Sequence, residues 1–298
     1  MKKKFSSQQG QAPNFYNSGQ AVLVVVLVMV VALTIGLAIS GRSVTDIKMS
    51  AQMEESQRAF SAAEAGIETA LLSGAGGSGM AGNASYNVKV SDTDKTEFVF
   101  PDKIPADEPY QIWLVKWDDL NTKVYDKDGI KIVWGNQNSN WANDNNTPAI
   151  VITIVYKDGN EYKFGKYALD PRTDRNNHFC LSNGNNCSGV SNWNTNGETI
   201  NGKTPKTLQF SADIDLSNFR GLGKTLQLLR MKLLYNNNGQ LLGVKALDSG
   251  ELPSQGKVIE STGTAGETTR EVNVLELGPS LPTAFDFSIF SEEDIIHD

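Results

Sequence analysis

The most prominent pattern in the chain is an uninterrupted apolar run at residues 21–40, AVLVVVLVMVVALTIGLAIS. This run carries no charge, and about twenty residues of α-helix span about 30 Å, the thickness of the hydrocarbon core of a bilayer. Valine favours strands in water, but a lone strand in lipid would leave its backbone groups without hydrogen-bond partners. The pattern therefore predicts a helix that enters a membrane.

The helical pattern continues beyond the apolar run. Residues 41–72 contain no proline, are rich in good helix formers, and place Glu54 and Arg58 in the favourable i, i+4 order. An apolar stripe recurs at spacings of three and four, formed by Ile47, Ala51, Phe60, Ala63, Ile67 and Ala70. We predict one helix over residues 20–72, with 21–40 in the membrane, and a glycine-rich linker at 73–82.

The rest of the chain, residues 83–298, alternates short β-rich runs with turn signals. The clearest predicted strands are 110–117, 130–134, 149–156, 207–216 and 271–277, and 258–263 with 269–274 reads as a strand, a turn and a returning strand. Asp128-Gly129, Asp158-Gly159-Asn160 and Asn237-Asn238-Gly239 are typical of tight hairpin turns. The predicted fold class is α+β: a long N-terminal helix followed by a β-rich antiparallel head.

The distribution of charge predicts how the helix is oriented in the membrane. The leader at residues 1–19 carries its charge on Lys2, Lys3 and Lys4, and lysine on one side of a membrane helix keeps that side cytoplasmic. The head should therefore face outward, as in a single-pass protein of the cytoplasmic membrane. The formal net charge of −7 argues against nucleic-acid binding, which needs a basic surface.

Two stretches in register carry a resemblance to a known family. Residues 19–30, GQAVLVVVLVMV, and 56–66, SQRAFSAAEAG, resemble the N-terminus of PilX-type minor pilins of type IV pili and are similar to the K-type minor pseudopilin of type II secretion. The resemblance implies that a prepilin peptidase cuts after Gly19, so that Gln20 becomes the mature N-terminus. It also implies that the helix packs against other pilin-like subunits in a filament.

Two positions depart from the pattern of major pilins. Val24 occupies the fifth mature position, where most major pilins carry glutamate, and Gln20 stands where an aromatic residue is more usual. The K-type pseudopilin and many PilX-type proteins resemble this chain in lacking that glutamate. The resemblance thus implies a structural subunit without catalytic activity, acting in assembly initiation or at the tip of a pilus or at the cell surface.

The same N-terminal residues have other interpretations. A secretory signal cleaved after Ala38-Ile39-Ser40 would release a soluble protein that begins at Gly41, and an uncleaved signal anchor is a third alternative. Either could present an adhesin-like surface-binding protein. Trp141 and Trp193, in the Asn-rich loops 136–146 and 183–196, could bind polysaccharide, or they could anchor these loops on the sheet.

The head offers few candidates for other chemistry. Cys180 and Cys187 would form a disulfide in an oxidising compartment, with reduced thiols or a zinc site with His178 as alternatives. Residues 126–129, DKDG, resemble part of a calcium loop but fit a hairpin turn. The carboxylate pairs Asp118–Asp119 and Asp213–Asp215 could serve a hydrolase or lie on solvated sheet faces. We expect no enzyme, no cofactor and no metal.

Overall fold

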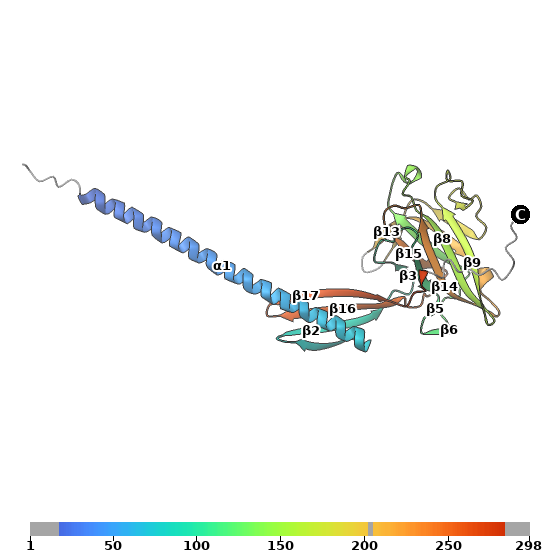
Figure 1. Ribbon diagram of the computed structural model, residues 1–298, viewed down its shortest axis with the longest axis horizontal. Helices are drawn as coiled ribbons and strands as arrows, with labels where there is room; N and C mark the ends of the chain where they lie inside the picture. The colour runs from blue at the N-terminus through green and yellow to red at the C-terminus, as the bar shows by residue number, and fades with distance from the viewer. Residues whose placement is uncertain (1–17, 202–204, 284–298) are drawn as a thin grey trace, which may run out of the picture. The chain divides into compact units, whose positions relative to one another are not determined.

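The computed structural model describes residues 18–201 and 205–283. Helix α1 (Ser18–Ser73) is followed by strands, so the predicted α+β class is confirmed (Figure 1). The helix extends the predicted range 20–72 by only a few residues, because no proline or glycine pair interrupts the segment. Residues 1–17 of the predicted leader lie outside the described residues.

The described chain forms two compact units. The first contains the described residues up to Thr69 together with Gly77–Val88 and Ser261–Val272. The second contains Ala70–Gly76, Lys89–Glu260 and the described residues from Asn273. The predicted single head from residue 83 onward is therefore divided, because the ends of two strand pairs group with the helix.

Two large sheets make up most of the second unit. The five-stranded sheet has the order β10 (Cys180–Leu181), β9 (Glu161–Asp170), β8 (Ala149–Asp158), β14 (Lys224–Leu234), β4 (Pro109–Trp113). The six-stranded sheet has the order β11 (Val190–Asn194), β13 (Lys206–Asp215), β7 (Gly129–Asn136), β15 (Leu242–Ala246), β3 (Glu97–Val99), with β12 (Glu198–Ile200) beside β13. Their pairings are antiparallel except for that of β9 with β10.

The core of the second unit lies between these two sheets. Alternate residues of β8 and β14 point into it, and so do alternate residues of β7 and β13, as the two-residue period of a strand requires. Trp134 and Phe210 are the largest aromatic side chains from the six-stranded sheet in this core, and both are essentially fully buried. We call this arrangement the sandwich.

A four-stranded sheet has the order β1 (Gly77–Ala81), β2 (Ala84–Asp92), β16 (Gly256–Ala265), β17 (Thr268–Leu277). The predicted strand, turn and returning strand near the C-terminus are thus confirmed as β16 and β17. The short elements β5 (Val115–Lys116), β6 (Asp119–Lys123), η1 (Trp141–Asn143) and η2 (Ser217–Phe219) complete the described chain.

The predicted linker at 73–82 needs a correction, since residues 77–81 form β1. The hairpin turns at Gly82, whose φ is +59°, and β1 pairs with β2 so that Gly79 faces Tyr86. A Cβ atom at position 79 would lie 2.4 Å from the hydroxyl oxygen of Tyr86. Glycine therefore serves here to admit the tyrosine ring rather than to supply flexibility.

The predicted turns had mixed outcomes. Asp158-Gly159-Asn160 does join the paired strands β8 and β9, with Gly159 at a φ of +61°. Asp128-Gly129 is not a hairpin turn, because Gly129 begins β7, whose partners β13 and β15 lie far along the chain. Asn237-Asn238-Gly239 connects β14 to β15, which belong to different sheets.

Candidate functional site

The N-terminal part of α1 exposes apolar side chains on every side of the helix. From Val22 to Met53, each valine, leucine, isoleucine and methionine is 49–70% exposed. Among the described residues, α1 is the one helix long and apolar enough to cross a membrane. An exposed apolar surface of this extent indicates contact with lipid or with other apolar surfaces. We call residues 21–40 the apolar span.

The predicted processing residues lie at the start of this surface. Gly19 and Gln20 fall in the first turn of α1, and Val24 is 55% exposed. The predicted apolar stripe is wrong in its first half, because Ile47, Ala51 and Phe60 are exposed. Phe60 nevertheless lines a shallow hollow together with Arg270 and Glu271 of β17.

The C-terminal part of α1 is buried through small residues. Ala59, Ala62 and Ala63 are 0% exposed, and the first two share a cluster with Ala84 of β2 and Ala265 of β16. Figure 1 shows this end of the helix beside β2, β16 and β17. Small side chains allow the helix and the strands to approach closely, as methyl groups fill little of the gap.

Two glycines bring the backbones even closer. A Cβ atom at Gly263 of β16 would lie 1.9 Å from the carbonyl oxygen of Ala59, and one at Gly66 would lie 2.3 Å from the Oγ atom of Ser261. The backbone of α1 therefore leaves no room for a side chain at Gly263, whereas at Gly66 an added side chain would displace the Ser261 hydroxyl. The segment Ser56–Gly66, which carries the family resemblance, is also the segment that packs on the sheet.

Polar contacts flank this packed segment. Arg270 Nε donates to Ser56 Oγ at 2.8 Å, and Thr268 Oγ1 donates to Glu55 Oε2 at 3.3 Å. The predicted pair between Glu54 and Arg58 is present at 3.3 Å. These side-chain contacts tie β17 to the part of α1 that follows the apolar span.

In the sandwich, Cys180 and Cys187 are joined by the disulfide that the sequence predicted. The Nε1 atom of Trp193 lies 3.1 Å from the Sγ atom of Cys180. Both sulfur atoms are thus engaged, so the alternative of a zinc site with His178 does not fit. Among the described residues, no group of three or more histidine, cysteine or acidic side chains could hold a metal ion.

The two candidate sugar-binding tryptophans pack against the core. The ring of Trp193 lies 5.5 Å from that of Trp134, and the ring of Trp141 lies 5.4 Å from that of Phe210, both edge to face. Such pairs stabilise by about 0.5–1.5 kcal/mol beyond area burial. This geometry favours the interpretation that Trp141 and Trp193 anchor the Asn-rich loops.

The predicted carboxylate groups have local partners. Arg220 pairs with both Asp126 and Asp128, which replaces the calcium-loop and hairpin-turn interpretations with an ion-pair cluster. The hydrogen bond from Arg220 lowers the pKa of Asp126 below its usual value. Asp213 accepts a hydrogen bond from Asn192 at 2.6 Å and lies 3.5 Å from the Nζ atom of Lys131.

Two of the remaining predicted acids, Asp215 and Asp119, also have local partners. Asp215 accepts the N–H of Ser217 at 2.8 Å, and Asp119 accepts the hydroxyl of Thr122 at 2.5 Å. Asp118 lies beside Asp119 on the surface of the β5–β6 turn. Each of these contacts organises a local turn.

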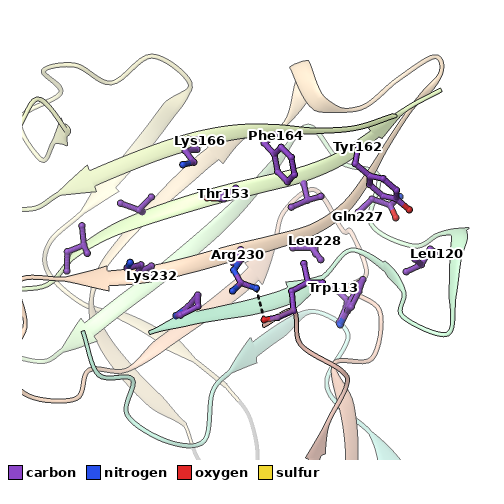
Figure 2. Close-up of a pocket in the computed structure, with 15 residues that line it drawn as sticks. Trp113, Leu120, Thr153, Tyr162, Phe164, Lys166, Gln227, Leu228, Arg230 and Lys232 are labelled. Atoms are coloured by element: carbon purple, nitrogen blue, oxygen red, sulfur yellow. Dashed lines mark hydrogen bonds between the residues drawn. The ribbon is translucent and has the colours of Figure 1, made fainter. Parts of the chain in front are cut away.

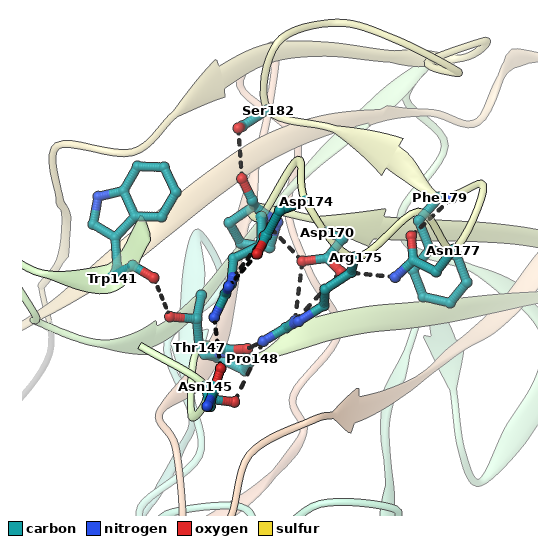
Figure 3. A network of polar contacts seen from close by, with 12 residues as sticks. Trp141, Asn145, Thr147, Pro148, Asp170, Asp174, Arg175, Asn177, Phe179 and Ser182 are labelled. Carbon is teal, nitrogen blue, oxygen red and sulfur yellow. Dashed lines mark hydrogen bonds and ion pairs between the residues drawn. The ribbon is translucent and has the colours of Figure 1, made fainter. Parts of the chain in front are cut away.

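A buried carboxylate at the end of β9 escaped the sequence analysis. Asp170 is 0% exposed and accepts hydrogen bonds from Asn177 Nδ2 at 2.7 Å, the N–H of Arg172 at 2.9 Å and Arg175 Nη1 at 3.1 Å (Figure 3). Arg175 also donates to the carbonyl oxygen of Thr147 at 2.7 Å. A buried charge is tolerated when it is paired and hydrogen-bonded in this way. The cluster fixes the loop that leads to the disulfide.

The outer face of the five-stranded sheet carries an apolar groove of about 520 Å³ (Figure 2). Tyr162 and Phe164 of β9 are 52% and 53% exposed along it. Outward side chains of β8 and β14 form its floor, together with Trp113 of β4 and Leu281 from the C-terminal segment. The charged residues among its described lining are Lys166, Arg230 and Lys232, all basic.

Sequence reasoning missed this groove, although one signal indicates it. The run AIVITIVY at 149–156 is apolar at nearly every position, whereas a strand with one solvated face should alternate. Val151 and Val155 consequently point away from the core and into the groove. A strand apolar on both faces predicts that something covers the second face.

No protein-family model matches the chain, and no curated protein is detectably similar to it in sequence.

Proposed function

We propose that the chain is a minor pilin or pilin-like structural subunit of a type IV pilus or a related secretion filament. The observation that carries the proposal is the apolar span, which exposes apolar side chains around the whole helix from Val22 to Ile39. Such a surface needs lipid before assembly and apolar helices of other subunits after it, because water would leave it uncovered. A subunit that passes from the membrane into a filament of pilin-like helices would meet both environments in turn.

The change in burial along α1 supports this division of roles. The span leaves the helix free for lipid or other subunits, while Ala59, Ala62 and Ala63 are covered by strands of the same chain. One continuous helix would thus join a membrane or filament segment to the β-rich part. The lysines at positions 2–4 support an orientation with the N-terminus inside and the sandwich outside.

The site residues have distinct roles in this proposal. A prepilin peptidase would cut between Gly19 and Gln20, removing the basic leader. Val24 at the fifth mature position cannot neutralise the terminal amine of a neighbouring subunit, whereas a glutamate could. A subunit without that charge suits a position at the start or the tip of a filament, where one neighbour is missing. No step in this role requires catalysis.

Mass spectrometry of the mature protein from its native host tests the proposal. We expect a methylated N-terminal Gln20. The matched variants are Gly19→Val, which should leave the leader attached, and Gly10→Val, a leader glycine away from the cut, which should be processed normally. A mature protein that begins at Gly41 would show a cleaved export signal and overturn the proposal. An intact Met1 would leave a signal-anchored protein and would also contradict it.

A further inference from the structure

The segment that follows β17 is held at the rim of the apolar groove. Gln111 of β4 holds the segment after β17 at two points: its Nε2 atom donates to the carbonyl oxygen of Pro279, and its Oε1 atom accepts the N–H of Leu281, both at 2.9 Å. Trp113 Nε1 donates to the same Pro279 oxygen at 2.9 Å. The chain is thereby fixed at the rim of the groove, with Leu281 among the lining residues.

Arg230 directs the chain further inward. This residue lies on the outward face of β14, and its guanidinium donates to the carbonyl oxygen of Leu281 at 2.9 Å and to that of Pro282 at 3.0 Å. Figure 2 shows a hydrogen bond from Arg230, with Phe164 and Lys166 on the opposite side of this arginine. The last described residues therefore lead over the central strands of the sheet.

The residues that follow Thr283 match the groove in chemistry. Residues 284–298, AFDFSIFSEEDIIHD, contain three of the twelve phenylalanines of the chain. Phe285, Phe287 and Ile289 alternate with Ala284, Asp286 and Ser288, so an extended segment would present the larger apolar groups on one face. The segment has five acidic residues and no lysine or arginine, opposite in sign to the charged lining of the groove.

We infer that residues 284–298 of the same chain bind in the groove, in cis. Fifteen extended residues reach about 50 Å, whereas crossing four neighbouring strands needs about 15–20 Å, so length does not limit the contact. Apolar side chains cover Phe164 and its neighbours, and acidic side chains approach Lys166. This inference rests on the sandwich alone and does not depend on the proposed filament role.

Chemical cross-linking of the full chain in lipid nanodiscs tests the contact. Thr153 lies in the floor of the groove, and Ser288 lies in the C-terminal segment, so Thr153→Cys with Ser288→Cys introduces two thiols with little change in size. A short bismaleimide should link them within one molecule, as mass spectrometry of the monomer band would show. The native disulfide does not react with maleimide. The control pair is Ser191→Cys with Ser288→Cys, since Ser191 is exposed on β11 of the other sheet.

Charge reversal separates specific binding from chance encounter. Lys166→Glu in the double-cysteine background should slow cross-linking by about threefold to tenfold, since it replaces attraction to the acidic segment with repulsion. Lys163→Glu makes the same change on the same strand but outside the groove lining, and it should leave the rate unchanged. Links mainly between two molecules would overturn the inference in favour of a second copy. A yield no higher than that of the Ser191 pair would overturn it as well.

Discussion

The apolar span of α1 and the core of the sandwich are built from the same residue types in opposite environments. Ile130, Ile152 and Leu229 are 0% exposed between two sheets, whereas Leu27 and Val28 are both 60% exposed on a single helix. The strands bury their apolar side chains against a partner sheet of the same chain. Among the described residues of its unit, the span has no such partner. Hydrophobic composition alone therefore does not determine burial; the neighbouring surface does.

The pattern of positions explains this difference. In the sandwich, apolar residues at every second position give each strand an inner face, and the chain can close a core around those faces. In the span, apolar residues at consecutive positions surround the helix, so no single covering surface could bury them all. The outer face of the five-stranded sheet is intermediate, because its apolar groove is bordered by basic residues.

The largest expected effect comes from the sandwich core. Phe210→Ala should lower the free energy of unfolding by about 3–5 kcal/mol, because it leaves a cavity beside Trp134 and Trp141. Leu27→Ala in the span should leave the unfolding of the sandwich unchanged. Denaturant unfolding of the full chain in detergent, followed by tryptophan fluorescence, measures both. A similar loss in the two variants would contradict the contrast between a self-covered core and an uncovered span.

Charge in the span should act on membrane insertion and not on the sandwich. Val28→Arg should make insertion less favourable by about 2.5–3.5 kcal/mol, the cost of arginine near the centre of a membrane helix. Val28→Leu is the control and should insert normally. The fraction of protein resistant to carbonate extraction reports insertion, and fluorescence unfolding reports the sandwich. Unchanged membrane retention of Val28→Arg would remove the basis for calling this segment a membrane or filament helix.

The point where exposure gives way to burial can be tested with glycine. Gly263→Ala should destabilise the helix–sheet contact by about 1–3 kcal/mol, because the added methyl group would meet the backbone of Ala59. Gly77→Ala is the control, since nothing lies within 4 Å of a Cβ atom there. Hydrogen exchange should rise over residues 58–67 of α1 only in Gly263→Ala. Equal protection in both variants would show that the close approach at Gly263 is not required.

The sequence predicted those parts of the fold that depend on local pattern. The bounds of α1 followed from an apolar run and the absence of proline, and the β8–β9 hairpin followed from Asp158-Gly159-Asn160. The prediction failed where the local structure depends on contacts with residues far away in the sequence. The sequence predicts a linker around Gly79 because it does not show that Tyr86 lies opposite this glycine in a hairpin. It predicts a turn at Asp128 because it does not show the ion pair with Arg220.

The candidate sites likewise differ in whether local sequence is enough to predict them. The span could be predicted because its chemistry lies in consecutive residues. The groove could not be placed, since its lining comes from β4, β8, β9, β14 and the C-terminal segment, and only the sheet order brings these together. The packing of Trp141 against Phe210, and of Trp193 against Trp134, could not be predicted either, because the two rings of each pair are far apart in the sequence.

The smallest expected effect is a dependence of stability on pH, which the sandwich should show and residues 21–40 should not. Residues 21–40 carry no titratable side chain, whereas the pKa of Asp126 in the sandwich is lowered by the hydrogen bond from Arg220. A lowered folded pKa means that the ion pair stabilises the native state above the ordinary pKa of 3.8, and that this contribution is lost as the pH falls through the folded value.

Asp126→Asn should therefore destabilise the sandwich at neutral pH by less than about 1 kcal/mol, since the pair is partly exposed. Its difference from the unaltered protein should shrink as the pH falls below 3.8. Asp102→Asn, at an exposed position, is the control. Unfolding midpoints measured between neutral pH and acid would show the convergence for Asp126→Asn only. A difference that stays constant with pH would mean that Asp126 acts through packing and not through its charge.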